Sequence, residues 1–85
     1  MTQNFAIDLS GANFEFISMN RVKLQLFQVR VQNDGKNHRF HMQLNDTGTF
    51  YITDKQTCPE IFHDLESAFS DAVIKLGEVS VINEY

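Results

Sequence analysis

The sequence predicts an α+β fold in which an antiparallel β-meander of four to five strands precedes one C-terminal α-helix packed on one face. Apolar and polar residues alternate along most of residues 5–53, as in strands with one buried face. Turn-forming residues separate these runs at short intervals. From residue 62 onward, apolar residues recur at three- and four-residue spacing, which is typical of a helix lying on a sheet.

Length and composition indicate a single domain spanning residues 1–85. With 85 residues, 42% hydrophobic and 21% charged, the chain has apolar material for one small core. No segment has the pattern of a secretory signal or the length of a membrane span, and the lone Cys58 excludes an internal disulfide. We therefore expect a cytoplasmic protein with no membrane contact.

Alternating apolar residues predict two strands at the start of the chain. These residues are Phe5, Ile7 and Leu9, followed by Phe14, Phe16 and Ile17. The run Ser10–Asn13 between them is rich in turn-forming residues, so we expect it to connect the two strands. A third extended segment follows from Val22 to Gln32.

Asp34-Gly35 is a strong hairpin signal, because both loop residues of a type I′ turn need positive φ. With these residues as the loop, the predicted cross-strand pairs are Gln32 with Asn37, Val31 with His38, Arg30 with Arg39, Val29 with Phe40, Gln28 with His41 and Phe27 with Met42. Apolar residues meet apolar ones and polar meet polar at nearly every pair, which supports this register.

The apolar alternation shifts by one residue between Leu26 and Phe27. Continued unchanged, the hairpin register would set Leu26 against Gln43 and reverse both faces of the sheet. One extra residue at this position restores the alternation and sets Leu24 against Leu44. We therefore predict a β-bulge there.

A short strand and the start of a helix follow. The turn-forming run at residues 45–48 precedes Phe50 and Ile52, which continue the inward-facing row. Thr57 and Glu60 match a capping box with Pro59 in the first turn, so we expect the helix to begin here.

The helix has a continuous apolar stripe. Its members are Phe62, Leu65, Phe69, Ala72, Val73 and Leu76. Gly77 is expected to end the helix. Residues 78–85 alternate weakly and suit either a short strand or a frayed end.

The stretch 38–41 places two histidines three residues apart, which raises the question of a metal site. Residues three apart in a strand point to opposite faces, so His38 and His41 cannot bind one metal ion together. Cys58 and His63 are the remaining soft or imidazole ligands, and they lack zinc-site spacing. We therefore expect no metal and no cofactor, and we expect His38 to close the edge of the core.

The hairpin register gathers polar residues on the sheet face opposite to the core. The candidate binding residues are Lys23, Gln28, Arg30, Arg39, His41, Gln43 and Tyr51. Arg30 directly opposite Arg39 is a like-charge pair, which a sheet disfavours unless an anion, an acidic partner or solvent relieves it. This pair makes the polar face the main candidate site.

The net charge of −4 is unevenly distributed. Charged residues in the segment 20–44 are mostly basic, whereas the expected helix carries acids at Glu60, Asp64, Glu66 and Asp71. We expect a small non-catalytic interaction domain that binds a protein partner, or a second copy as a homodimer, through its basic sheet face. In a homodimer the basic sheet of one copy would meet the acidic helix of the other, or the two sheets would pack or join at their edges. The alternative is a single-stranded nucleic-acid-binding module that uses the same face.

No catalytic residues are expected. The sequence has no Gly-rich phosphate loop, no paired-carboxylate signature and no serine nucleophile motif. Cys58 lies at the expected helix start, where the backbone N–H groups can lower a thiol pKa. However, the nearest base along the chain, His63, projects from a different side of the helix start, so a reactive Cys58 is a distant third hypothesis.

Overall fold

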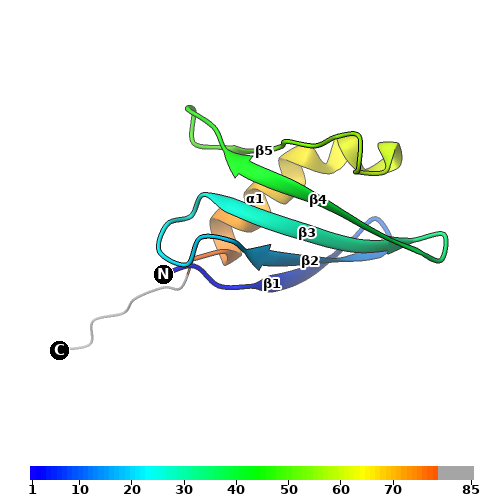
Figure 1. Cartoon of the computed structure of the whole chain (residues 1–85), viewed down its shortest axis with the longest axis horizontal. Helices are drawn as coiled ribbons and strands as arrows, with labels where there is room; N and C mark the ends of the chain where they lie inside the picture. Colours follow the sequence, from blue (N-terminus) through cyan, green and yellow to red (C-terminus); the bar gives the residue numbers. More distant parts are fainter. Residues whose placement is uncertain (79–85) are drawn as a thin grey trace.

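Five antiparallel strands form one sheet and a helix follows them in the computed structural model, which describes residues 1–78 (Figure 1). The strands lie in sequence order: β1 (Phe5–Leu9), β2 (Ala12–Ser18), β3 (Leu26–Asn33), β4 (Lys36–Leu44) and β5 (Phe50–Ile52). A 3₁₀ helix, η1 (Glu60–Leu65), leads into the α-helix α1 (Glu66–Leu76). The predicted α+β meander with one C-terminal helix is confirmed.

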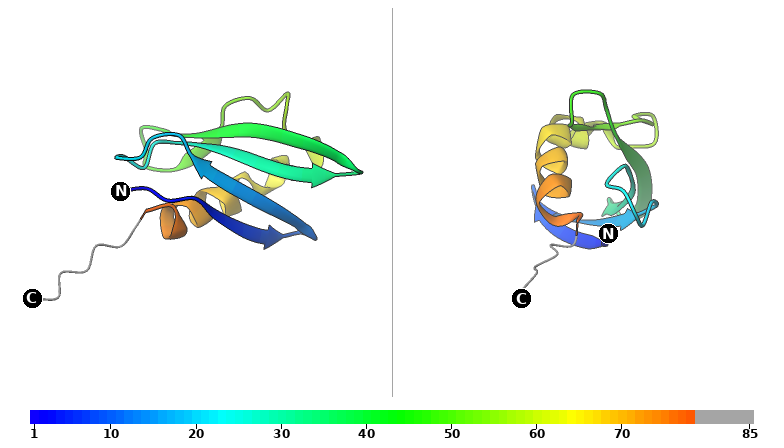
Figure 2. Two further views of the ribbon diagram at one scale, coloured as in Figure 1. Left: turned by 60° about the horizontal axis from the view of Figure 1, so that its bottom comes forward. Right: turned by 90° about the vertical axis from the view of Figure 1, so that its left-hand side faces the viewer.

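The sheet curves around α1, so that one face is buried and the other points outward (Figure 2). The core consists of Phe14, Phe16, Phe27, Val29, Val31, Phe40, Met42, Phe50, Ile52, Cys58, Phe62, Phe69 and Val73. The ring of Phe69 on α1 has its centroid 4.8 Å from that of Phe14 and 5.8 Å from those of Phe16 and Phe40. Because each such pair adds about 0.5–1.5 kcal/mol beyond area burial, Phe69 anchors the helix on β2 and β4.

Both two-residue hairpin turns have the conformation that sets strand register. Asp34 and Gly35 adopt φ of 54° and 74°, and all the predicted pairs between β3 and β4 are present. In the first hairpin the loop is Ser10-Gly11, with φ of 52° and 79°. The expected turn was therefore too long, because its last residues, Ala12-Asn13, belong to β2 and pair with Leu9 and Asp8 of β1.

The predicted β-bulge is wrong, because the hairpin register continues unchanged from the turn back to Leu26, the first residue of β3. Leu26 pairs with Gln43, and the N–H of Leu44 donates to the carbonyl of Gln25 over 2.9 Å. No residue is inserted between the two strands at this point. Leu26 consequently points to the face of the sheet that faces away from α1.

The segment before β3 is a loop, although the sequence predicted an extended strand from Val22. The side-chain oxygen of Asn20 accepts the N–H groups of Val22 (3.1 Å) and Lys23 (3.0 Å), which bends the chain locally. Leu24 packs against the core from this loop. Leu24 can therefore pack against the core without pairing with a residue of β4 and without a bulge in β3.

The helix begins without the predicted capping box. The hydroxyl of Thr57 donates to the carbonyl of Asp54 over 2.9 Å, and Pro59 precedes η1 instead of lying in its first turn. The helical segment therefore starts as η1, and α-helical geometry begins only at Glu66.

The end of α1 is joined to the start of the chain. Gly77 ends the helix as predicted, and a Cβ there would lie 2.7 Å from the carbonyl oxygen of Val73, so lack of space requires glycine. The carbonyl of Gly77 accepts the N–H of Gln3 over 2.9 Å, and Glu78 bridges to Thr2. The expectation for residues 79–85 lies outside the described residues.

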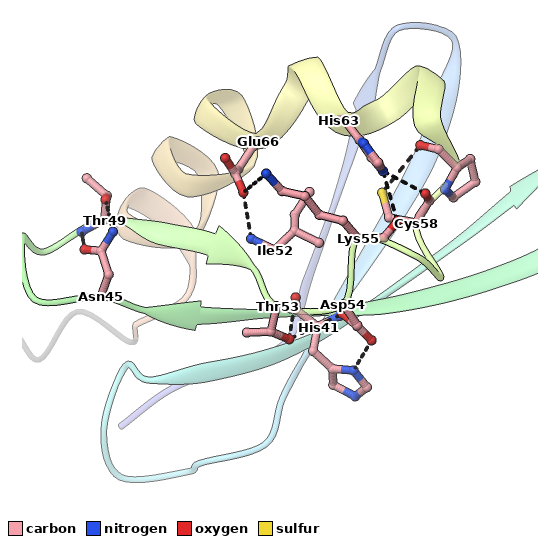
Figure 3. A network of polar contacts seen from close by, with 11 residues as sticks. His41, Asn45, Thr49, Ile52, Thr53, Asp54, Lys55, Cys58, His63 and Glu66 are labelled. Atoms are coloured by element: carbon pink, nitrogen blue, oxygen red, sulfur yellow. Dashed lines mark hydrogen bonds and ion pairs between the residues drawn. The ribbon is translucent and has the colours of Figure 1, made fainter.

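Two side chains of α1 close the outer edge of β5. The N–H of Phe50 donates to Ser70 Oγ over 2.9 Å, and the N–H of Ile52 donates to Glu66 Oε2 over 2.8 Å, the second of which Figure 3 shows. Lys55 Nζ lies 3.7 Å from the same Glu66 oxygen. The amide groups that this edge strand would otherwise present to another chain are thus used within the molecule.

Replacing Ser70 by alanine should destabilise the fold by about 1–2 kcal/mol, because the buried N–H of Phe50 loses its acceptor. Ser67→Ala on the exposed side of the same helix is the matched control, since it makes the same change in helix propensity without losing a bond to the sheet. Urea unfolding of both variants measures the difference. Equal unfolding midpoints would contradict the proposed role of Ser70.

Candidate functional site

The outer face is the side of the sheet that points away from α1. It is formed by alternate strand residues: Ala6, Asp8, Asn13, Glu15, Ile17, Leu26, Gln28, Arg30, Gln32, Asn37, Arg39, His41, Gln43 and Tyr51. Six of the seven candidate binding residues lie on this face, where Gln28 pairs with His41, Arg30 with Arg39 and Gln43 with Tyr51. Lys23 is the exception, because it lies in the loop before β3 instead of on the sheet.

The two opposed arginines are part of a longer row of charges. Glu15 on β2 pairs with Arg30 on the side away from Arg39, so a carboxylate flanks the like-charge pair. The Nε–H of Arg30 donates to the side-chain oxygen of Gln28 over 2.9 Å, which directs that guanidinium along its own strand. We call Glu15, Arg30 and Arg39 the charged end of the outer face.

The charged end borders a hollow of about 1010 Å³. Both arginines line it, together with Glu15 and the backbone of the first hairpin turn at Gly11. His38, expected at the edge of the core, is partly buried and also lines this hollow. A charged side chain of another molecule that enters this hollow would meet the guanidinium donors of Arg30 and Arg39 and the carboxylate acceptor of Glu15.

The opposite end of the outer face is apolar. Leu26 lies here because the register between β3 and β4 is unbroken. It pairs with Gln43 on β4, and Gln43 pairs in turn with Tyr51 on β5. Met19 continues β2 by one residue, since its N–H donates to the carbonyl of Leu26 over 2.9 Å, and its side chain is 53% exposed. Ile17 lies one row closer to the charged end. We call Ile17, Met19, Leu26 and Tyr51 the apolar end.

Sequence reasoning missed most of the apolar end. The shift of phase at Leu26 is the available signal, but in the sequence it equally fits the predicted bulge, which keeps the apolar residues on the core side. The sequence predicts that Ile17 lies in a strand, but it does not show which face of the sheet Ile17 occupies. Tyr51, 39% exposed, was predicted as part of the site, although as a member of a polar surface.

His41 is held by an acid that the sequence analysis did not foresee. The backbone N–H of His41 donates to Asp54 Oδ1 over 2.6 Å, and Nδ1 of its ring lies 3.0 Å from Asp54 Oδ2 (Figure 3). Because an ionised carboxylate can only accept, Nδ1 is the donor of this second bond. β5 ends at Ile52, so Asp54 supplies the acceptor that a longer strand would have supplied to this N–H.

The pKa of Asp54 reflects this position. Partial desolvation alone would raise it, but hydrogen bonds from the side chain and backbone of His41 and from Thr57 outweigh that effect and hold the pKa below its ordinary value of 3.8. The acid is therefore a structural partner of His41. It also places negative charge beside the face that the sequence predicted to be basic.

Cys58 does not have the environment of a reactive thiol. Its side chain is buried, and desolvation, followed by the nearby charges of Asp54 and Glu66, raises its pKa to about 11. His63 Nε2 lies 2.9 Å from the carbonyl oxygen of Cys58 and 3.0 Å from that of Lys55, so the imidazole binds backbone and not sulfur. These contacts argue against a nucleophilic or redox role.

The Asp54 carboxylate should make stability depend on pH in the acidic range. Since its pKa is lower in the folded state, its contribution is present above the ordinary value of 3.8 and is lost as pH falls through the folded value. Asp54→Asn keeps the shape but removes this titration. Between about pH 5 and about pH 2.5, the urea midpoint of the variant should therefore fall less than that of the unmodified chain.

Asp46→Asn provides the matched control, because Asp46 is exposed and its carboxylate makes no hydrogen bond within residues 1–78. Its urea midpoint should follow that of the unmodified chain over the same range. If Asp54→Asn follows it as well, the carboxylate of Asp54 does not stabilise the fold.

Within residues 1–78, no group of three or more histidine, cysteine, aspartate or glutamate side chains is arranged to hold a metal ion. In the same segment, no helix has the length and apolar character needed to cross a membrane. Comparisons with protein-family models, curated proteins and solved structures gave no match.

Proposed function

We propose that the chain is a small non-catalytic interaction domain that binds a protein partner through the outer face. The observation that carries this proposal is the apolar end, where Leu26, Ile17 and Tyr51 lie on the side of the sheet that α1 does not cover. Apolar residues on an uncovered face raise the free energy of the isolated chain and lower it again when a partner buries them.

The composition of the outer face supports a protein as the partner. Protein interfaces combine an apolar centre with a polar rim and are enriched in aromatic residues, methionine and arginine. The apolar end supplies Tyr51 and Met19, and the charged end supplies Arg30 and Arg39 on the same surface. Burial of the apolar end would provide affinity, and the charged end would fix orientation.

The arginines are available for such contacts. Within residues 1–78, the ion pairs are His41 with Asp54 and Lys55 with Glu66, and neither involves Arg30 or Arg39. Both arginines are exposed beside the hollow of the charged end. A partner that presents a carboxylate to this hollow would relieve the like-charge pair that Glu15 flanks on one side only.

Single-stranded nucleic acid is the alternative ligand, and the geometry supports it less well. Affinity for the backbone depends on several cations that neutralise phosphates together. Here Glu15 lies in the same row as the arginines, Asp54 is bonded to His41, and Lys23 lies off the sheet. Within residues 1–78, Tyr51 is the one phenylalanine, tyrosine or tryptophan on the outer face, whereas stacking platforms use several such rings.

We place the domain in the cytoplasm. Its one thiol, Cys58, is buried in the core and remains a small apolar group there. A reducing compartment suits this protein, because Cys58 is a free thiol in the described residues 1–78 and such a compartment keeps thiols reduced.

Replacing residues of the apolar end should weaken partner binding. A partner captured from cell extract is first purified, and its affinity is then measured by calorimetry with the unmodified chain, Leu26→Asp and Tyr51→Ala. Loss of one buried apolar anchor should weaken binding at least about tenfold. Ile61→Asp is the control, because Ile61 is 68% exposed on η1, away from the outer face. This variant should bind the partner with unchanged affinity.

Unchanged affinity of both Leu26→Asp and Tyr51→Ala, with folding verified by NMR, would refute binding at the apolar end. Titration with single-stranded oligonucleotides separates the alternative. Affinity that falls steeply with salt and is lost in Arg30→Glu, but not in Tyr51→Ala, would assign the face to phosphate contacts instead.

A further inference from the structure

The two edges of the sheet differ in how their backbone groups are used. At β5, the side chains of Ser70 and Glu66 accept the outward N–H groups. β1 is the opposite edge, and it lies at the periphery of the molecule in Figures 1 and 2. Within residues 1–78, no turn, loop or side-chain hydrogen bond reaches the main-chain groups of Ala6 or Asp8 on this strand.

The turn after β1 determines which of its backbone groups face outward. A two-residue type I′ turn at Ser10-Gly11 makes Leu9 and Ala12 a hydrogen-bonded pair. Bonded and non-bonded pairs alternate along an antiparallel ladder, so the groups of Phe5, Ile7 and Leu9 point to β2. The N–H and C=O groups of Ala6 and Asp8 therefore point to the open edge.

The inward side chains of β1 are incompletely covered. Phe5, Ile7 and Leu9 pack against the core but each remains partly buried, whereas the inward residues Phe14 and Phe16 on β2 are 0% exposed. Phe5 is held in place, because its ring stacks on Phe16 with centroids 4.6 Å apart. An added strand would cover this apolar row and also satisfy the free backbone groups.

We propose that a second copy of this chain supplies that strand, so that β1 pairs antiparallel with β1 of the other copy about a two-fold axis at Ile7. In this register Ala6 faces Asp8 of the second copy, which joins the outward groups in four hydrogen bonds. Phe5 faces Leu9 of the second copy, and the two Ile7 side chains meet. The two five-stranded sheets become one sheet of ten strands.

Charge and length select this register over its neighbours. An axis at Asp8 would set two aspartates directly against each other, which is unfavourable. An axis at Ala6 would leave Leu9 beyond the paired segment. The axis at Ile7 pairs all five residues of β1 and places each Asp8 opposite an alanine. This dimer does not depend on the function proposed for the outer face.

Ala6→Pro tests the edge. Proline at Ala6 removes an N–H that points outward, so the bonds to β2 are kept, but the ladder to a second copy is blocked. In sedimentation equilibrium, the unmodified chain should show concentration-dependent dimerisation at about 10–500 μM. Ala6→Pro should weaken dimerisation at least about tenfold, and Leu26→Asp should leave it unchanged.

Cysteine cross-linking tests the register. In an antiparallel sheet, Cα atoms of a non-hydrogen-bonded pair are about 4.5 Å apart, which is within the range that a disulfide can bridge. Ile7→Cys should therefore form a disulfide dimer under mild oxidation. Ala6→Cys is the matched control and should not, because the two Ala6 residues are offset along the strands. Cys58 can stay in place, since it is buried.

A monomeric mass over the whole concentration range would overturn the proposal. So would a dimer that Ala6→Pro leaves intact, because the chains would then meet elsewhere. Cross-linking through Ala6→Cys in preference to Ile7→Cys would overturn the register. Loss of partner binding in Leu26→Asp with the dimer intact would show that the two surfaces act separately.

Discussion

The attachment of α1 to β5 and to the inner face of the sheet is the constraint on which the rest of the structure depends. Phe69 fills the curve of the sheet by contacting rings on β2 and β4, while Ser70 and Glu66 accept the outward N–H groups of β5. One helix therefore buries one face and closes one edge. Two surfaces of the sheet remain for other molecules, the outer face and the edge of β1.

Local signals made the β3–β4 hairpin predictable. Asp34-Gly35 defines both the turn and the register, since a two-residue loop leaves one way to pair the flanking residues. The pairing of β2 with β3 had no such signal, because the loop between them depends on hydrogen bonds from Asn20. The position of Glu15 beside Arg30 follows from that pairing, so it was not available from the sequence.

Leu26 shows why alternation alone did not locate the apolar end. A one-residue shift in the apolar alternation is compatible with two structures. Either a bulge keeps every apolar residue on the core face, or the strand ends with one apolar residue on the outer face. The sequence favoured the first because Leu24 also needed burial. In the structure Leu24 is partly buried and packs against the core from a loop, so nothing requires a bulge. The choice depended on tertiary packing, as did the bond that His41 donates to Asp54, 13 residues further along the chain.

A dimer joined at β1 would alter what the outer face can bind. The outer faces of the two copies would lie on one continuous sheet, with their apolar ends related by the two-fold axis. A partner with two equivalent sites would then bind the second by an intramolecular step, which raises the overall affinity without any new contact. Each single interface would then be small, as expected for one face of an 85-residue domain. Closure of the β5 edge by Ser70 and Glu66 would limit assembly to two copies, because a sheet with one open edge forms a closed pair and not a fibre.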